Sequence, residues 1–225
     1  MGIAPDRDSW ETHWHSSDGW RSLFGRMASV VRRQILSRAA CHYAEAYFPR
    51  QGVFLECGCG TGQCSSRISR AERRLVAVDF ATAALLEARK VAAFAGFVQA
   101  DIQGLPFPDK SVAGIWNLGV MEHFDARVTR EILEEFCRVL KPGAVAILFW
   151  PPEYGSSRCV LAPIEWIWSK RARRSVRFFP DEVNRLRSKS HARRSLTEAG
   201  LETAAIHFSL RDLFTHMVVV ARKPA

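Results

Sequence analysis

Short apolar runs alternate along this chain with segments in which apolar residues recur at helical spacing. The runs that read as strands lie at 53–56, 74–79, 96–100, 112–118 and 144–150. Between them, the alanine-rich residues 81–94 contain no Gly or Pro, and residues 127–140 end at Lys141-Pro142-Gly143, so both segments are predicted helices. Strands that alternate with helices are typical of parallel βαβ units. The pattern therefore predicts a doubly wound, mostly parallel α/β sheet.

The C-terminal third follows a different pattern. Residues 181–199 predict a helix with Gly200 as its stop, and residues 202–210 and 216–222 predict two strands joined by a short link. Two strands joined in this way form an antiparallel hairpin. With the five upstream strands, this C-terminal antiparallel hairpin brings the predicted sheet to seven.

The first 49 residues are predicted to form a helical cap or lid over a main domain of residues 50–225. Residues 1–20 show no clear period, whereas apolar residues from Ser22 to Ile35 recur at helical spacing. A second helical stretch, 40–48, is limited by Pro49. Within the main domain, a basic, tryptophan-containing insertion is expected at about 151–195.

Composition indicates a soluble globular protein. The 225 residues suffice for one core, and 48% of them are hydrophobic and 24% charged. The N-terminus carries no apolar run, and no stretch approaches the roughly 18 apolar residues of a membrane-spanning helix. We therefore expect a cytoplasmic protein, peripheral at a membrane at most, whose six cysteines are mostly reduced.

A glycine-rich turn follows the first predicted strand. Glu56 ends the strand, and Gly58, Gly60 and Gly62 follow at alternate positions before a polar segment that can open a helix. Such glycines permit positive φ angles and let a ligand approach the backbone closely. A dinucleotide fingerprint needs glycine where Gln63 or Ser65 stands, and no Gly-Lys-Ser/Thr follows for a phosphate loop. The Glu56 carboxylate would repel a pyrophosphate but suit a cationic or hydroxyl-bearing ligand.

Three cysteines and two histidines invite a metal interpretation. Cys57, Cys59 and Cys64 lie in the glycine turn, and His13 and His15 lie near the N-terminus. The cysteine spacing matches no standard zinc pattern, and the two histidines lack nearby acid or thiol partners. We therefore expect no metal site and interpret the cysteines as small residues tolerated around a tight turn.

Polar residues stand at the ends of four successive predicted strands. They are Glu56, Asp79, Asp101 and Asn117. In an open α/β sheet the ligand binds at the carboxyl ends of the strands, so these side chains are expected at one edge. Asp79 lies 19 residues after Gly60, near the usual place of a ribose-hydroxyl acceptor, and it could also cap a helix that starts near Ala81.

The run Glu56-x-Gly58-x-Gly60-x-Gly62 resembles motif I of the class I S-adenosylmethionine-dependent methyltransferases, in particular their small-molecule, "type 11"-like branch. Asn117 to Phe124 resembles the fourth-strand motif of that branch, and Lys141-Pro142-Gly143 resembles its turn before strand five. The resemblance covers residues 50–150 by motif and the last strand pair by pattern. It implies a seven-stranded, Rossmann-like sheet and S-adenosyl-L-methionine as the cofactor.

The resemblance also implies roles for single residues. The three glycines would pass close to the methionine portion of the cofactor. Asp79 would accept hydrogen bonds from the ribose hydroxyls, and Asp101 and Ile102 would bind the adenine. The cofactor-binding residues implied in full are Glu56, Gly58, Gly60, Gly62, Asp79, Phe80, Asp101, Ile102, Asn117 and Leu118.

The predicted reaction asks little of the protein, because a sulfonium methyl group is already a strong electrophile. A base is needed only when the acceptor must lose a proton early, as a hydroxyl must. His123 is the candidate base, since imidazole titrates near neutrality. The alternative is a histidine that packs at a helix start, where Glu122 would be favoured by the helix dipole.

A strongly basic segment accounts for most of the net charge of +9. Between Lys170 and Arg194 lie ten bases and two acids, a balance of +8. This segment is a solvated face or a docking surface for an anionic substrate, a membrane or, as an alternative function, RNA or DNA that is bound or methylated. With the aromatic residues of 160–179 and 10–20, it predicts a lid that sets the choice of acceptor.

The sequence thus predicts methyl transfer to a small-molecule acceptor, lipid- or quinone-like if the protein docks at an anionic membrane surface. It indicates no obligate protein partner.

Overall fold

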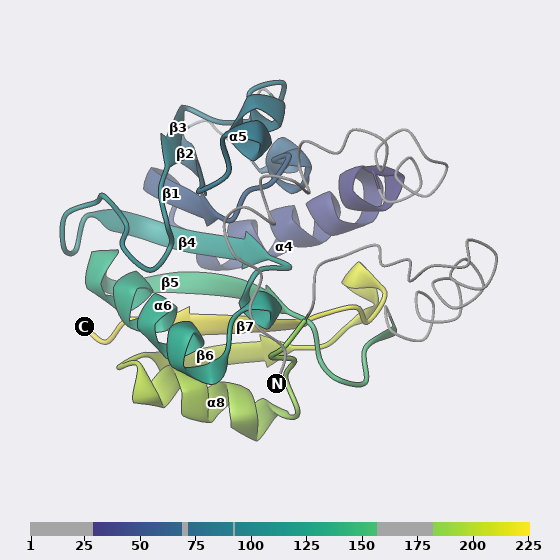
Figure 1. The fold of residues 1–225 in the computed structure, drawn as a ribbon, viewed down its shortest axis with the longest axis vertical. Helices are drawn as coiled ribbons and strands as arrows, with labels where there is room; N and C mark the ends of the chain where they lie inside the picture. The colour runs from purple at the N-terminus through teal and green to yellow at the C-terminus, as the bar shows by residue number, and fades with distance from the viewer. Residues whose placement is uncertain (1–28, 69–71, 92, 157–181) are drawn as a thin grey trace.

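A single seven-stranded sheet organises the protein (Figure 1). The computed structural model describes residues 29–68, 72–91, 93–156 and 182–225. Its strand order is β3-β2-β1-β4-β5-β7-β6, in which β1 to β5 are mutually parallel and β7 pairs antiparallel with both β5 and β6. The strands are β1 Gln51–Cys57, β2 Glu72–Asp79, β3 Gly96–Gln99, β4 Val112–Leu118, β5 Leu140–Trp150, β6 Glu202–His207 and β7 Met217–Arg222. The predicted fold class is confirmed.

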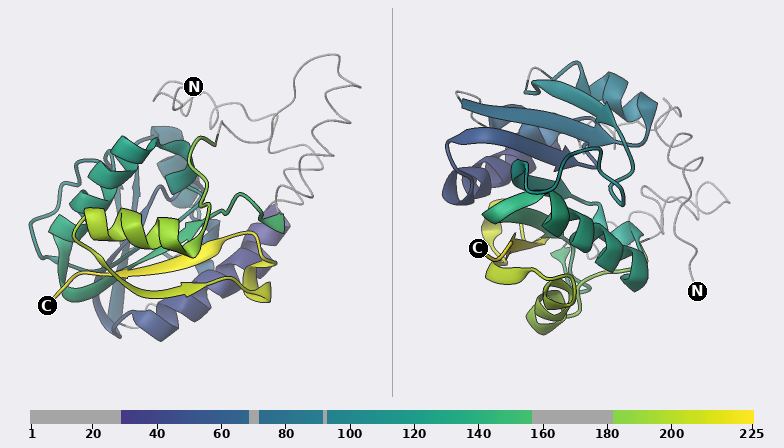
Figure 2. Two further views of the ribbon diagram at one scale, coloured as in Figure 1. Left: turned by 90° about the horizontal axis from the view of Figure 1, so that it is seen from below. Right: turned by 90° about the vertical axis from the view of Figure 1, so that its left-hand side faces the viewer.

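Helices cover both faces of the sheet (Figures 1 and 2). On one face, α4 (Ser37–Tyr47) buries Tyr43 against Phe54 and Phe149. On the other, α6 (Ala126–Val139) and α8 (Lys189–Glu198) bury an apolar cluster that includes Phe136 and Leu196. A strand covered on both faces needs apolar side chains at nearly every position, which is why β4 is a continuous apolar run rather than an alternating one.

The N-terminal helix joins the core of the sheet. Residues 29–31 are helical, η1 (Arg32–Leu36) is a π-helical turn, and α4 continues directly from it. The two predicted N-terminal helical segments are therefore continuous where the structure describes them. Residues 1–28 lie outside the described residues, so the cap or lid formed with them stays a prediction.

The helix predicted over 81–94 is shorter: α5 spans Thr82–Ala88. The chain turns after Ala88 and brings the Phe94 ring against Gly62, where an added Cβ would lie 2.5 Å from Phe94 Cε2. Ala95 N then donates to Leu75 O at 2.7 Å and leads into β3. Helix propensity continues beyond Ala88, but the tertiary contact between Phe94 and the glycine turn overrides it.

Two other predicted boundaries are wrong. The residues after the glycine turn form only a short 3-10 helix, η2 (Gln63–Arg67). The predicted turn Lys141-Pro142-Gly143 lies inside β5, because a register shift opposite Val112 and Gly114 absorbs the extra residues. Gly143 takes a φ of 75° there, and its N–H donates to Lys223 O at 3.0 Å.

The helix predicted over 181–199 begins only at Lys189, after Ser188, whose side chain accepts from His191 N. Residues 182–187 are extended instead. Their backbone N–H groups donate to other elements: Val183 and Asn184 to Glu122 O, and Leu186 to Pro151 O at 3.0 Å. These long-range hydrogen bonds use groups that a helix would have paired internally.

We predict that Arg73→Leu lowers the free energy of unfolding by about 2–4 kcal/mol. Arg73 is 6% exposed, forms an ion pair with Glu45, and donates to Pro49 O at 2.9 Å and Phe48 O at 3.3 Å at the end of α4. Leucine would leave these two carbonyl groups without their donor. Urea denaturation measures the loss.

The neighbouring Arg74→Leu is the matched control, because Arg74 is exposed on the opposite face of β2. Its substitution is expected to change stability by no more than about 0.5 kcal/mol. Equal losses in the two variants would contradict the structural role of Arg73.

Candidate functional site

The predicted polar edge forms where β2, β1 and β4 end side by side. β1 lies between β2 and β4, with Cys57 opposite Val78 and Glu56 opposite Trp116. Glu56, Asp79 and Asn117 are all buried at this edge. The structure therefore brings together three of the four strand-end residues that the sequence singled out.

The glycine turn has the conformation that its spacing predicts. Gly58, Gly60 and Gly62 have φ angles of 71°, 49° and 65°. A Cβ added to Gly58 would lie 2.6 Å from Val120 Cγ2, so the strand-four segment packs directly on the turn. Positive φ and this close approach both require glycine.

Asp79 ties the turn to the end of β2. Its Oδ2 accepts from Gly60 N at 2.9 Å, and its Oδ1 accepts from Ala81 N at 3.0 Å. Asp79 thus binds the N–H of Ala81, the residue before α5, but α5 has no side-chain cap, so the predicted capping role is wrong. A carboxylate has about four acceptor positions, so these two bonds leave it able to accept from ligand hydroxyl groups as well.

Glu56 is 3% exposed, and its Oε2 accepts from Ser65 Oγ at 2.6 Å. Burial raises the pKa of Glu56 to about 8; the Ser65 hydrogen bond opposes this shift and the charge of Asp79 adds to it. Glu56 is thus uncharged at neutral pH in the free protein. An ionised carboxylate was expected at this position from the sequence. A cationic ligand group would lower the pKa of Glu56 again and so restore the carboxylate.

The residues expected around an adenine ring are less enclosed. Asp101 is exposed, and its Oδ1 accepts from Gln103 N at 2.9 Å. Ile102 is buried, whereas Phe80 is half-buried beside Thr82. Asp101 follows the edge strand β3, so it lies further out than the three strand-end residues of β1, β2 and β4.

The end of β4 carries a second polar group. Asn117 is fully buried, and neither its Nδ2 nor its Oδ1 has a hydrogen-bond partner. In η3 (Met121–His123), Glu122 is 4% exposed and its Oε2 has no partner. From the sequence, Glu122 was expected only as an acid favoured by the dipole at a helix start. Its burial could have been suspected because it lies between the apolar residues Met121 and Phe124.

Burial lowers the pKa of His123 to about 4, opposed by the charge of Glu182 and reinforced by that of Arg185. His123 is therefore an uncharged imidazole at neutral pH and a weak proton acceptor. Its assignment as the base stays a prediction.

Residues 182–187 form a wall beside η3. The backbone N–H groups of Val183 and Asn184 donate to Glu122 O. In addition, Asn184 Nδ2 donates to Thr129 Oγ1 at 2.9 Å, and Asn184 O accepts from Trp150 Nε1 at 2.7 Å. The wall is thus joined to η3, α6 and the end of β5. Local sequence patterns cannot predict this wall, because its contacts join residues more than 30 positions apart.

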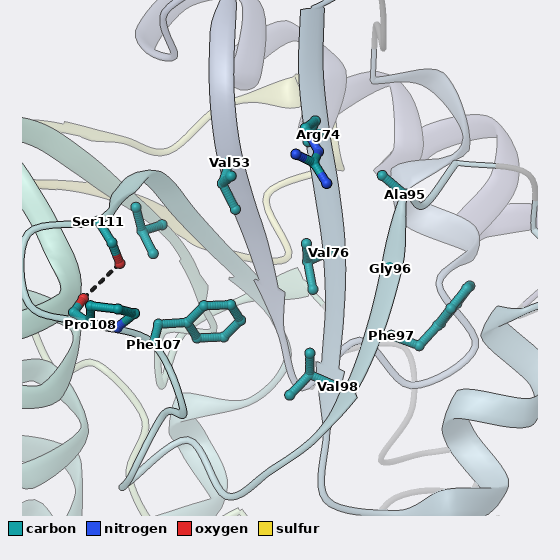
Figure 3. A pocket seen from close by; sticks show the side chains of 11 residues that line it. Val53, Arg74, Val76, Ala95, Gly96, Phe97, Val98, Phe107, Pro108 and Ser111 are labelled. Atoms are coloured by element: carbon teal, nitrogen blue, oxygen red, sulfur yellow. Dashed lines mark hydrogen bonds between the residues drawn. The ribbon is translucent and has the colours of Figure 1, made fainter.

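A cavity of about 370 Å³ lies elsewhere on the sheet, beside the first halves of β1 and β2 (Figure 3). Val53, Val76, Val98 and Phe107 supply its apolar lining, and Arg74 stands at its border. None of the predicted site residues lines it. We therefore place the candidate site at the glycine turn and not in this cavity.

Among the described residues, no group of three or more His, Cys, Asp or Glu side chains could hold a metal ion. Burial raises the pKa values of the thiols of Cys57, Cys59 and Cys64, the last to about 12, so all three stay protonated. His13 and His15 lie outside the described residues. The described helices include none long and apolar enough to cross a membrane.

Residues 54–143 match the family model of a methyltransferase domain. The malonyl-[acyl-carrier protein] O-methyltransferase of Yersinia pestis is 37% identical over 98 residues, which are 43% of this chain and 35% of that protein. The enzyme of the same name from Pectobacterium atrosepticum is 30% identical over 165 residues, 71% of this chain and 62% of that protein. The chain spans about a third to a half of the length of several curated relatives that it matches.

Solved structures share the fold. The magnesium protoporphyrin IX methyltransferase of Synechocystis with bound SAH has a TM-score of 0.68 at 17% identity, over 97% of this chain and 100% of that one. The 1,6-didemethyltoxoflavin-N1-methyltransferase of Burkholderia thailandensis has a TM-score of 0.66 at 16% identity, over 100% and 93%.

The family match begins in β1 and runs through the glycine turn, the strand-end acids and η3. It thus covers the residues whose geometry is described above. Residues 54–143 form a methyltransferase domain, and in this region the chain is similar to S-adenosylmethionine-dependent methyltransferases.

Proposed function

We propose that the protein transfers a methyl group from S-adenosyl-L-methionine to a small-molecule acceptor. The observation that carries the proposal is the glycine turn, held open by positive φ angles and joined to Asp79 through Gly60 N. A Cβ at Gly58 would lie 2.6 Å from Val120 Cγ2, so only glycine keeps the turn in this place. Similarity to S-adenosylmethionine-dependent methyltransferases supports the same cofactor.

The residues of the turn suit the parts of that cofactor. The glycine backbone would lie along its methionine portion, where Glu56 can ionise beside a cationic group. Asp79 would accept from ribose hydroxyls, and Asp101, Ile102 and Phe80 would bind the adenine. Asn117 and Leu118, at the end of β4, complete the predicted donor side. When bound, the cofactor supplies an electrophilic methyl group, and the protein supplies position and exclusion of water.

A small-molecule acceptor is supported by a structural neighbour that has 1,6-didemethyltoxoflavin bound. One group of relatives is named for malonyl-[acyl-carrier protein] as the acceptor. A lipid- or quinone-like acceptor and docking at an anionic membrane remain proposals. Most of their predicted surface, residues 157–181, lies outside the described residues, as does the region 10–20.

The described part of the basic segment adds no separate argument for nucleic acid. Arg185 pairs with Glu182, and Arg187 lies 3.5 Å from Glu153. Lys189, Arg193 and Arg194 are exposed on α8. A gel shift that weakens steeply with salt would favour the nucleic-acid alternative.

We expect Asp79→Asn to weaken S-adenosylmethionine binding about 10- to 100-fold. The amide has one acceptor oxygen, so it cannot hold Gly60 N and Ala81 N and also accept from ribose hydroxyls. Isothermal titration calorimetry measures the affinity. Asp109→Asn, an exposed acid that pairs with Arg138 away from the turn, is the control. Failure of the folded wild-type protein to bind the donor would contradict the proposed function.

Glu56 also gives the free protein a characteristic pH dependence. Its pKa is about 8 in the folded state and near its ordinary value of 4.5 when unfolded. Between these values only the folded state keeps the proton, so the free energy of unfolding falls as pH rises from about 4.5 to 8. Glu56→Gln removes this loss, and we expect it to be more stable than the wild type by about 1–3 kcal/mol at pH 9.

Urea denaturation at pH 5 and pH 9 checks this prediction, since the advantage of Glu56→Gln should be smaller at pH 5. Ser65→Ala is a useful comparison because it removes the hydroxyl that bonds to Glu56 while leaving the carboxyl group in place. An advantage of Glu56→Gln that does not change with pH would show that Glu56 is not buried as a neutral acid.

A further inference from the structure

Among the described residues, three buried side chains have hydrogen-bonding atoms without partners, Trp116, Asn117 and Glu122, and all three lie near the end of β4. Both polar atoms of Asn117 and Oε2 of Glu122 are in this condition. Leaving such an atom unpaired in the interior costs about 1–3 kcal/mol. Fully buried polar groups are otherwise paired throughout most proteins, so these atoms need a ligand to account for them.

The position of Asn117 and Glu122 separates them from Glu56 and Asp79, and Asn117, which is also predicted to contact the donor, lies where the donor and the acceptor would meet. Asp79 and Glu56 stabilise the glycine turn from the side of β2 and η2. Asn117 and Glu122 follow β4, on the opposite side of β1. Val120, between them in sequence, packs against Gly58. Asn117 and Glu122 therefore lie next to the turn, on the side that faces β5 and the wall of residues 182–187.

Glu122 is held firmly in this place. Its backbone oxygen accepts from Val183 N at 2.7 Å and from Asn184 N at 3.0 Å. Its Oε1 lies 3.5 Å from the position of a Cβ built on Gly119, so the carboxyl group turns back toward the end of β4. A carboxyl group fixed in this way is preorganised to bind a ligand group.

The charges around Glu122 set its protonation. Burial raises the pKa of Glu122 to about 8; its own backbone N–H and the charge of Arg185 oppose the shift, and Glu182 adds to it. The neighbouring His123 is uncharged, with its pKa lowered to about 4. At neutral pH the group therefore offers an O–H from Glu122 and both an N–H and a carbonyl oxygen from Asn117, and it carries no strong base.

Resting on the methyl transfer proposed above, we propose that the acceptor is a carboxylate and that Asn117 and Glu122 donate hydrogen bonds to it. Two uncharged donors suit an anionic oxygen, which an ionised glutamate would repel. A carboxylate also needs no base, because it is already ionised near neutrality. A hydroxyl acceptor would need a proton acceptor stronger than His123, and an ammonium group would favour an ionised acid.

The reaction balances without a further reactant. One carboxylate oxygen forms a bond to the methyl carbon as the bond between that carbon and sulfur breaks, and the bonding pair remains on sulfur. The products are a methyl ester and a thioether, both uncharged at the reacting atoms. No proton is transferred, so Glu122 keeps its proton and acts only by binding and orienting the acceptor.

The first experiment identifies the acceptor group with defined probes. The full-length protein is incubated with tritiated-methyl donor and malonyl-pantetheine, hexanoate or benzoate, or with hexanamide, hexanol or hexylamine as matched compounds without a carboxylate. Alkali releases volatile labelled methanol from methyl esters but not from methyl ethers or amines. We expect alkali-labile label with at least one carboxylate and none with the matched compounds. Label only on the matched compounds, or none on any carboxylate, would overturn the proposal.

The second experiment tests Glu122 through the pH profile at saturating donor. The wild-type kcat/KM for the carboxylate should fall at least tenfold between pH 7.5 and 9.5, because ionised Glu122 loses its O–H and repels the acceptor. Glu122→Gln keeps a donor and cannot ionise, so its alkaline fall should disappear. Asp109→Asn, which changes an exposed acid away from the site, is the control and should retain the fall. An unchanged alkaline fall in Glu122→Gln would refute the role of Glu122.

Asn117→Ala should raise the KM for the carboxylate about 10- to 100-fold. Donor binding, measured by calorimetry on the same wild-type sample, separates the two proposals. Absence of donor binding contradicts the methyltransferase function itself. Donor binding without transfer to any carboxylate overturns only the assignment of the acceptor.

Discussion

The hydrogen bond from Gly60 N to Asp79 is the contact on which the site depends. It joins the turn after β1 to the end of β2 and, with Asp79 bound also to Ala81 N, fixes the start of α5. Phe94 can then pack on Gly62, and Val120 on Gly58. The turn is thus held from both sides by elements that are distant in sequence, and only glycine fits at these contacts.

Holding acids in this edge has a cost in stability. Glu56 and Glu122 are buried, and their pKa values of about 8 mean that burial makes their ionised forms unfavourable. An apolar residue at either position would avoid this penalty. Their presence fits the general tendency of binding sites to retain groups that destabilise the free protein, because a ligand supplies the missing partner.

Local patterns predicted the fold well where a segment is governed by its own composition. β4 was predicted to the residue, and the glycine turn and the C-terminal hairpin were predicted correctly. The failures involve contacts distant in sequence: α5 stops early because Phe94 packs on Gly62, and residues 182–187 are extended because they bond to η3 and β5. Periodicity contains no information on such partners. The unpaired atoms of Asn117 and Glu122 likewise appear only when burial is known.

The two sides of the site come from different parts of the chain. The residues proposed to bind the donor lie within residues 54–143, which match the family model. The wall beside Glu122 comes from residues 182–187, beyond that match, and is attached through Asn184 to Thr129 and Trp150. A common donor domain can therefore take different acceptors as the segments after β5 change. Glu122 belongs to the matched region, and its backbone oxygen accepts hydrogen bonds from the wall. In the proposed reaction its side chain therefore connects the donor-binding domain with the segment that would select the acceptor.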